Sequence, residues 1–230
     1  DRGVGGLKTA LPEARDGFSP QQIDLGRLLF FDPILSANHS LSCATCHNPA
    51  QGFSDGMGRG RGINGSIQQR SAPTLWNSGF LSLFFWDARA TSLEQQAKSP
   101  LFSVNEMGNT PAKLLASMQQ SPAYKKLFAQ AFPEHPQAVS IEHILTALSA
   151  FQSSLISLNS RYDQYAHGYH QALNEQELEG LNIFRSFVAR CSQCHTPPLF
   201  TNQQIAVIGT PEPSDLPRDI GAEKTFNASV

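Results

Sequence analysis

CATCHNPAQGF, from Cys43 to Phe53, and CSQCHTPPLF, from Cys191 to Phe200, share the pattern Cys-x-x-Cys-His. Together the two stretches contain all four cysteines of the 230-residue chain. Because cysteine occurs nowhere else, we expect the four thiols to serve one chemical purpose. That purpose decides the fold.

Cys-x-x-Cys-His is the attachment signature of a c-type haem. Two thiols three positions apart can form thioether bonds to the two vinyl groups of one porphyrin, and the adjacent histidine then binds the iron. The pattern predicts two covalently bound haem c groups, one held by Cys43, Cys46 and His47, the other by Cys191, Cys194 and His195.

Two other uses of paired cysteines fit less well. A redox disulfide needs no histidine beside it, and a four-cysteine zinc site places its pairs about 15–20 residues apart. Here 148 positions separate Cys43 from Cys191. Two complete copies of the motif with no cysteine left over favour haem.

Composition limits the remaining classes. A formal net charge of −2 gives no sign of a nucleic-acid-binding surface. The most apolar run, FLSLFFW from Phe80 to Trp86, is too short for a transmembrane segment. The chain opens DRGVGGLKTA, which we interpret as a mature form without its export signal. Since haem c is attached in exported proteins, we expect a bacterial periplasmic location, or the cell surface.

Helix signals dominate the chain. Ser19-Pro20, Thr110-Pro111 and Ser121-Pro122 each combine an N-cap with proline at the first helical position. Apolar residues recur at helical spacing over 141–158, and a further capped helix is predicted from Asn174 into the second motif. Between the first motif and Pro73 lies a long glycine-rich loop, which we expect to cover the first haem.

The predicted fold class is mostly α, with two c-type cytochrome-like domains, each wrapped round one covalently attached haem. We place the N-terminal haem domain at 1–165 and the C-terminal haem domain at 166–230.

Longer stretches carry a family resemblance. GRLLFFDPILSANHSLSCATCHNPAQGFSD, RSAPTLWN, FFWDARATSLEQQAKSPLFSVNEMGNTP and LNEQELEGLNIFRSFVARCSQCHTPPLFTN resemble the bacterial di-haem cytochrome c peroxidase and MauG family over nearly the whole chain. The resemblance implies that hydrogen peroxide reacts at the N-terminal haem. It also implies that the C-terminal haem stores and relays electrons, with a tryptophan between the two.

Carried over by motif, Trp86 is the bridging tryptophan, although a core aromatic is the alternative. Glu106, Gln96 and Pro100 occupy positions that the family uses around the peroxide. Cleavage of peroxide needs a proton moved from one oxygen to the other, which the carboxyl group of Glu106 could perform and Gln96 could assist by hydrogen bonding. A solvated glutamate is the alternative. Arg89 is expected to pair with a haem propionate or to form a surface salt bridge.

Two departures from the family pattern stand out. Between Asn48 and Asp87 there is no histidine to cap the first iron, and Met57 is the only conventional iron ligand in the loop. We therefore expect an open first haem, a pattern closer to MauG-type enzymes. Ser71 stands where relatives usually have an asparagine that binds calcium. A backbone carbonyl there could still bind one calcium ion.

The second haem lacks an evident sixth ligand. No Met, His or Tyr follows His195, whereas the family takes that ligand from a later segment. We expect that a C-terminal part is missing or that another polypeptide completes the site. His167, His170 and Met118 are earlier candidates that do not match the family's position.

The functional hypothesis is an oxidoreductase that uses hydrogen peroxide to oxidise a protein partner. Oxidation of an aromatic residue on that partner is slightly favoured over peroxide detoxification with electrons from a small cytochrome c or cupredoxin. A di-haem electron carrier without catalysis is the remaining alternative. A carrier should have two low-spin haems, whereas an open site requires one high-spin haem.

Overall fold

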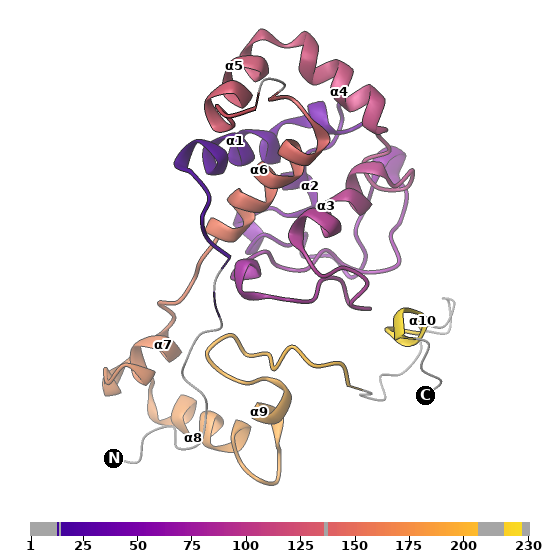
Figure 1. Ribbon diagram of the computed structural model, residues 1–230. Helices are drawn as coiled ribbons and strands as arrows, with labels where there is room; N and C mark the ends of the chain where they lie inside the picture. The colour runs from indigo at the N-terminus through magenta and orange to yellow at the C-terminus, as the bar shows by residue number, and fades with distance from the viewer. Residues whose placement is uncertain (1–12, 14, 136–137, 207–218, 227–230) are drawn as a thin grey trace. The chain divides into compact units, whose positions relative to one another are not determined.

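The computed structural model describes residues 13, 15–135, 138–206 and 219–226, and its regular structure is helical (Figure 1). Among these residues there is no strand, only two isolated β-bridges. The predicted mostly α fold is confirmed. The α-helices are α1 Pro20–Phe31, α2 Cys43–Cys46, α3 Leu93–Phe102, α4 Pro111–Gln120, α5 Pro122–Ala131, α6 Ile141–Ser154, α7 Arg161–Ala166, α8 Glu175–Phe184, α9 Cys191–Cys194 and α10 Glu223–Phe226.

Short 3₁₀ turns punctuate the connections between these helices. They are η1 Pro33–Leu35, η2 Pro49–Gln51, η3 Ile63–Gly65, η4 Ser78–Phe80 and η5 His170–Ala172. Two of them, η2 and η3, lie in the stretch between the first motif and Pro73, which contains no α-helix and was predicted to be a loop.

The chain forms two compact units that interleave in sequence. Unit 2 consists of 15–79 and 90–156, and unit 1 consists of 1–14, 80–89 and 157–230. Segment 80–89, which carries Trp86, therefore belongs to the same unit as the second cysteine motif. The domains 1–165 and 166–230 stay a prediction.

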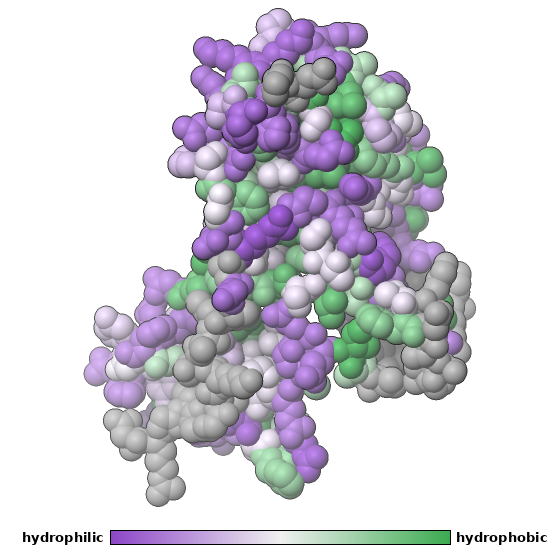
Figure 2. Space-filling view, viewed as in Figure 1, coloured by the Kyte–Doolittle hydropathy of each residue, from purple (hydrophilic) through white to green (hydrophobic). Residues whose placement is uncertain are grey.

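The core of unit 2 forms around α1 and α6, which lie side by side (Figure 1). The two backbones approach so closely that a Cβ atom on Gly26 would lie 1.8 Å from the carbonyl oxygen of Ala147. Leu29, Phe30 and Ile144 are among the side chains that are almost fully buried at this contact. On the outside of the unit, polar side chains gather over α5 (Figure 2).

Helix starts follow the predicted caps. The hydroxyl of Ser19 accepts a hydrogen bond from the amide of Gln22, and Thr110 and Ser121 cap α4 and α5 in the same way. Helix ends were predicted less well. Helix α6 stops at Ser154 rather than continuing to 158, and α8 stops at Phe184, so that a turn separates it from the second motif.

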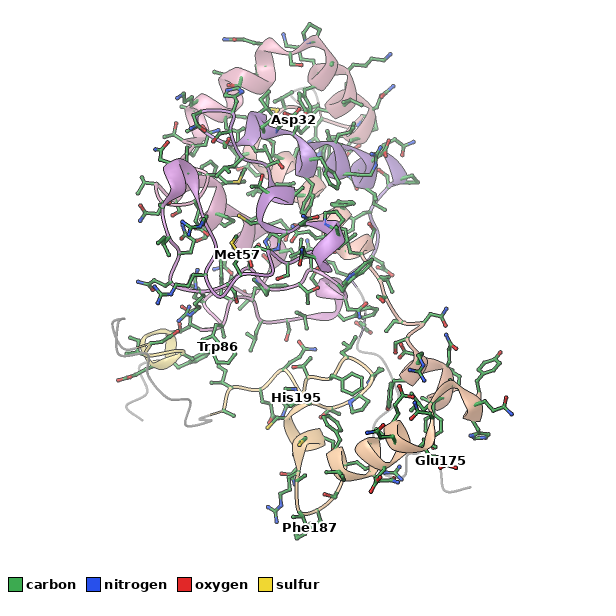
Figure 3. The ribbon with its side chains drawn as sticks, turned by 180° about the vertical axis from the view of Figure 1, so that it is seen from behind. Asp32, Met57, Trp86, Glu175, Phe187 and His195 are labelled. Carbon is green, nitrogen blue, oxygen red and sulfur yellow. The ribbon has the colours of Figure 1, made fainter. Side chains whose placement is uncertain are left out.

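Unit 1 is held by polar contacts as much as by packing. Arg161 on α7 forms a two-pronged ion pair with Glu177 on α8. Within the described part of 157–226, the only buried apolar side chain is that of Pro197. Figure 3 shows Phe187 at the far end of the loop between α8 and α9, away from His195.

One negative finding concerns membranes. Across the described residues, no helix is both long enough and apolar enough to span a bilayer.

Candidate functional site

The first cysteine motif forms a single helical turn. Cys43 and Cys46 begin and end α2, and the amide of His47 donates to the carbonyl of Cys43 at 2.8 Å. Side chains three positions apart share one face of a helix, so both thiols point the same way. Both cysteines are free thiols. The motif therefore places two thiols on the same side of one helical turn, with a histidine directly after them.

The His47 ring is oriented for metal binding. Its Nδ1 lies 3.0 Å from the carbonyl oxygens of both Phe53 and Pro73. A carbonyl oxygen can only accept, so Nδ1 carries the hydrogen and Nε2 keeps the lone pair that an iron ion needs. Burial lowers the pKa of His47, which favours the neutral ring, although the two carbonyl contacts oppose that shift.

The second motif repeats this arrangement in unit 1. Cys191 and Cys194 bound α9, and Nδ1 of His195 lies 3.2 Å from the carbonyl oxygen of Phe200. Both thiols are again free, and no group of three or more His, Cys, Asp or Glu side chains suited to a metal ion occurs among the described residues. Both motifs place two thiols on one helical turn with a histidine directly after it, the arrangement that attachment of a c-type haem requires.

Glu106 lies close to the first motif. The loop after α2 approaches both, because the Cys46 thiol lies 3.5 Å from the carbonyl oxygen of Arg61 and the amide of Ile63 donates to the carbonyl of Glu106 at 2.7 Å. Burial raises the pKa of Cys46, and the charges of Asp55 and Glu106 add to the rise. The structure thus brings together two residues that the sequence separates by 60 positions.

Position 62 has room only for glycine, because the loop there packs closely against the residue before Glu106. Its backbone angles are open to any residue, but an added Cβ would lie 1.9 Å from the carbonyl oxygen of Asn105. That same oxygen accepts hydrogen bonds from the side chains of Ser66 and Gln68. Gly62, Ser66 and Gln68 of this loop therefore all lie against Asn105, the residue directly before Glu106.

Sequence reasoning missed Asp55. Its Oδ1 accepts from the amide of Met57 at 3.0 Å, whereas Oδ2 is buried with no hydrogen-bond partner. The Asp55 charge raises the pKa of Cys46 and opposes the fall at His47. Asp55 follows the first motif by only eight positions, and that proximity was the signal available in the sequence.

Gln96 and Pro100 lie one helical turn apart on α3, a helix that the sequence analysis did not single out. Ser92 caps it by accepting from the amide of Gln95 at 3.1 Å. Because Pro100 has no amide hydrogen, it cannot make the helical hydrogen bond to the carbonyl of Gln96. Both side chains are half-buried. The two predicted residues therefore lie on one helix, and the Gln96 carbonyl lacks the donor that a residue other than proline would supply at position 100.

Trp86 and Arg89 lie in the unit 1 segment 80–89. The indole of Trp86 is 65% exposed within the chain, and Figure 3 shows it beside α10. Arg89 pairs with Asp87 at 2.7 Å and stacks over the Phe85 ring with its guanidinium carbon 3.4 Å from the ring centre. The bridging role of Trp86 and the propionate role of Arg89 stay predictions.

Other predicted ligands fall in separate places. Ser71 is exposed, and the proposed calcium ion stays a prediction. Met57 is 42% exposed in the glycine-rich loop. Met118 is fully buried in the core of unit 2, whereas His167 and His170 lie in unit 1, where Nδ1 of His167 contacts the carbonyl of Asp163 at 2.7 Å.

Comparisons with known proteins agree on one group. The family model described as di-haem cytochrome c peroxidase matches residues 20–171. The chain is 36% identical over 200 residues to the methylamine utilization protein MauG of Methylorubrum extorquens, covering 87% of this chain and 56% of that protein. It is 38% identical over 177 residues to cytochrome c551 peroxidase of Pseudomonas aeruginosa, covering 77% and 51%.

A solved structure matches along almost the whole chain. The crystal structure of a MauG-like protein associated with microbial copper homeostasis superposes with a TM-score of 0.82 at 29% identity, covering 97% of this chain and 71% of that one. The chain spans about half the length of the two sequence relatives. The helical structure and these matches together support the cytochrome-like domains predicted from the two motifs.

Proposed function

Since this chain belongs to the di-haem cytochrome c peroxidase family, we propose that it is a bacterial periplasmic oxidoreductase that uses hydrogen peroxide to oxidise a protein partner. Membership of that family implies two haem c groups. We assign one to Cys43, Cys46 and His47, and the other to Cys191, Cys194 and His195. When bound, these haems would supply the redox chemistry that cleaves peroxide and stores electrons.

Glu106 is the proposed proton carrier. Its carboxyl group takes a proton from one peroxide oxygen and returns it to the other, which makes water the leaving group. The observation that carries this role is the hydrogen bond from Ile63 to the Glu106 backbone, in a loop whose Arg61 carbonyl also contacts Cys46. Both contacts come from one short stretch, and this supports a position for the turn bearing Glu106 beside the first motif.

Gln96 is proposed to orient the peroxide, and Pro100 to support it. The side-chain amide of Gln96 can both donate and accept, so it can bind either oxygen of a small peroxide. Pro100 leaves the Gln96 carbonyl without its helical donor, which makes this turn of α3 more polar than an ordinary helix interior.

Trp86 is the proposed relay between the haems, and the electron source is a protein. We favour an aromatic side chain of a partner protein, because no histidine between Asn48 and Asp87 is available to close the first site at rest. Peroxide detoxification with a small cytochrome c or cupredoxin is the second candidate. It is supported by the identity with a cytochrome c551 peroxidase.

The deciding test of the catalytic site is Glu106→Gln. We expect both haems to attach normally and the reaction with hydrogen peroxide, measured by stopped-flow absorbance, to slow by about 10²–10⁴-fold, because the amide cannot carry the proton. A wild-type rate would remove Glu106 from the mechanism.

A matched pair of loop variants tests the positioning of Glu106 without touching its side chain. Gly62→Ala forces the loop and the Asn105 turn apart, whereas Gly58→Ala lies in the same loop with no atom within 4 Å of the added carbon. We expect a slower peroxide reaction in Gly62→Ala alone. Equal rates in the two variants would show that the loop does not position Glu106.

Two further measurements separate the candidate functions. Electron paramagnetic resonance of the oxidised holoprotein should contain a high-spin signal if the first haem is open, whereas a simple carrier gives low-spin signals only. Mass spectrometry of a partner incubated with enzyme and peroxide should show added oxygen or a new cross-link for aromatic modification. A partner of unchanged mass that has lost electrons would support detoxification.

A further inference from the structure

The segment that carries Trp86 is fastened to the second haem-binding loop by one side chain. Oε1 of Gln203 accepts from the amide of Ser82 at 2.8 Å and from the Ser82 hydroxyl at 2.9 Å. Nε2 of the same side chain donates to the carbonyl of Phe80 at 3.1 Å. Gln203 and Ser82 are 121 positions apart, and both belong to unit 1. A single amide therefore makes three long-range hydrogen bonds.

Gln203 is itself tied to the second motif. The neighbouring Asn202 donates from its backbone amide to the carbonyl of Cys194 at 2.8 Å and from its side chain to the carbonyl of Gln193 at 3.0 Å. Further back, Nδ1 of His195 contacts the carbonyl of Phe200. The loop 195–203 thus returns to its own cysteine motif before Gln203 reaches segment 80–89.

The Trp86 segment depends on such an anchor. The indole is 65% exposed, so its position is set mainly by the backbone that carries it. That backbone is a tight turn in which Phe85 and Ala88 both have positive φ, and the amide of Ala88 donates to the carbonyl of Phe85 at 3.2 Å. A turn closed by its own hydrogen bond keeps its internal conformation, so contacts outside the turn determine how it is oriented. Its orientation to the rest of unit 1 is set by the buried side chains of Phe84 and Ala88 and by the hydrogen bonds of Gln203 to the start of the segment.

We propose that Gln203 is a positioning residue that fixes the Trp86 turn against the loop holding His195, and so sets the rate at which electrons leave the second haem. The inference rests on the proposed relay role of Trp86. Glutamine suits this task because one planar amide presents an acceptor to Ser82 and a donor to Phe80 at the same time. Leucine would offer neither, and glutamate would keep the acceptor but lose the donor.

The test uses the holoprotein with its second haem reduced. Mixing with hydrogen peroxide in a stopped-flow instrument and following the absorbance of that haem gives the rate of its oxidation. We expect Gln203→Leu to slow this step by about 10-fold, because small misplacements of reacting groups have large effects on rate. Gln204→Leu is the matched control, since its side chain is exposed one position further on, and it should leave the rate unchanged.

A double variant separates positioning from general damage. If Gln203 acts through Trp86, Gln203→Leu should add no further slowing in a Trp86→Phe background. Additive slowing would overturn the inference. So would a normal rate in Gln203→Leu while Trp86→Phe is slow, and that result would leave the proposed relay intact. A normal rate in Trp86→Phe itself would overturn the relay and the inference together.

Two milder variants cover the case in which Gln203→Leu does not fold. Ser82→Ala removes only the hydroxyl contact, and Gln203→Glu replaces the donor to Phe80 with a charged acceptor while keeping the acceptor for Ser82. Each should slow the step by about 2- to 5-fold, with an unchanged visible spectrum of the second haem. Wild-type rates in both would contradict the proposal.

Discussion

The two units differ in what forms their interior. In unit 2 a continuous cluster of buried apolar side chains runs from α1 through α4, α5 and α6. Among the described residues of unit 1, the buried apolar side chains are Phe80, Phe84 and Ala88, from the short segment that precedes α3, and Pro197. The stretch from α7 to the second motif adds none. Unit 2 therefore has a core of packed apolar side chains, whereas few apolar side chains of unit 1 are buried.

The contrast has a thermodynamic consequence. A group that binds only the folded state stabilises it, and small domains that bury little apolar surface depend most on such groups. A haem attached at Cys191 and Cys194 would bring a large apolar surface to the second motif, where the rings of His195 and Phe184 lie 6.4 Å apart. The second haem should therefore be a condition for folding unit 1, while the first should be mainly a functional part of unit 2.

The largest expected effect comes from removing each attachment in turn. Cys191→Ala with Cys194→Ala should leave unit 1 unfolded, so that proteolysis within 157–206 accelerates on the order of tenfold or more. Cys43→Ala with Cys46→Ala should leave the core of unit 2 protected, because α1 and α6 pack without help. Limited proteolysis with peptide mapping measures both. Equal loss of protection in the two double variants would contradict the contrast.

The second effect tests the protein core of unit 2. Gly26→Ala places a carbon atom 1.8 Å from the carbonyl of Ala147, so α1 and α6 must separate. We expect the free energy of unfolding of unit 2 to fall by about 3 kcal/mol, the upper part of the range for overpacking. Urea unfolding followed by far-ultraviolet circular dichroism measures it. A loss below about 0.5 kcal/mol would mean that the helices do not meet as closely as described.

The sequence predicted local features better than distant ones. Caps at Ser19, Thr110 and Ser121 were predictable because each depends on a hydrogen bond spanning three residues. The haem motifs were equally local. The end of α6 at Ser154 was missed because the apolar spacing continues to 158 although the helical backbone does not. Periodicity alone could not locate that change.

Contacts between distant segments were beyond the sequence. Trp86 belongs to the unit of the second motif, and hydrogen bonds between Ser82 and Gln203 join its segment to that unit, although neither residue carries a recognisable pattern. Asp55 was missed for a related reason, since an acidic residue in a glycine-rich loop usually faces solvent, whereas here Oδ2 is buried. Family resemblance supplied Glu106, and the loop contacts through Ile63 supply its physical setting.

A smaller effect on the stability of unit 2 is expected from a hydrogen bond at the end of α1. The Tyr124 hydroxyl donates to Oδ2 of Asp32 at 2.6 Å, and Oδ1 of Asp32 accepts from the amide of Ile34. Tyr124→Phe should lower the stability of unit 2 by about 1.5 kcal/mol, because the acceptor is charged. Tyr165→Phe, in unit 1, is the control. Its hydroxyl makes no hydrogen bond to any of the described residues, so we expect a change near zero.

The same tyrosine gives a pH dependence. Burial raises the pKa of Tyr124, and the hydrogen bond to Asp32 raises it further. A raised pKa in the folded state means that the neutral phenol stabilises the fold below the unfolded value of about 10, and that this contribution is lost as pH rises above it. The stability gap between wild type and Tyr124→Phe should therefore be constant from pH 6 to 9 and shrink in more alkaline solution. A gap that widens there would reverse the assigned direction.

The smallest expected effect is at a glycine of unit 1, where the backbone conformation, and not a lack of space, disfavours other residues. Gly168 follows α7 with φ of 98°, and an added Cβ would meet no atom within 4 Å. Gly168→Ala should destabilise unit 1 by about 1 kcal/mol through strain alone, and Gly168→Asn by less, because asparagine tolerates positive φ. Urea unfolding followed by the absorbance of the second haem measures both. If alanine and asparagine cost the same, unit 1 responds to side-chain size after all, and its interior is closer to that of unit 2 than the buried residues indicate.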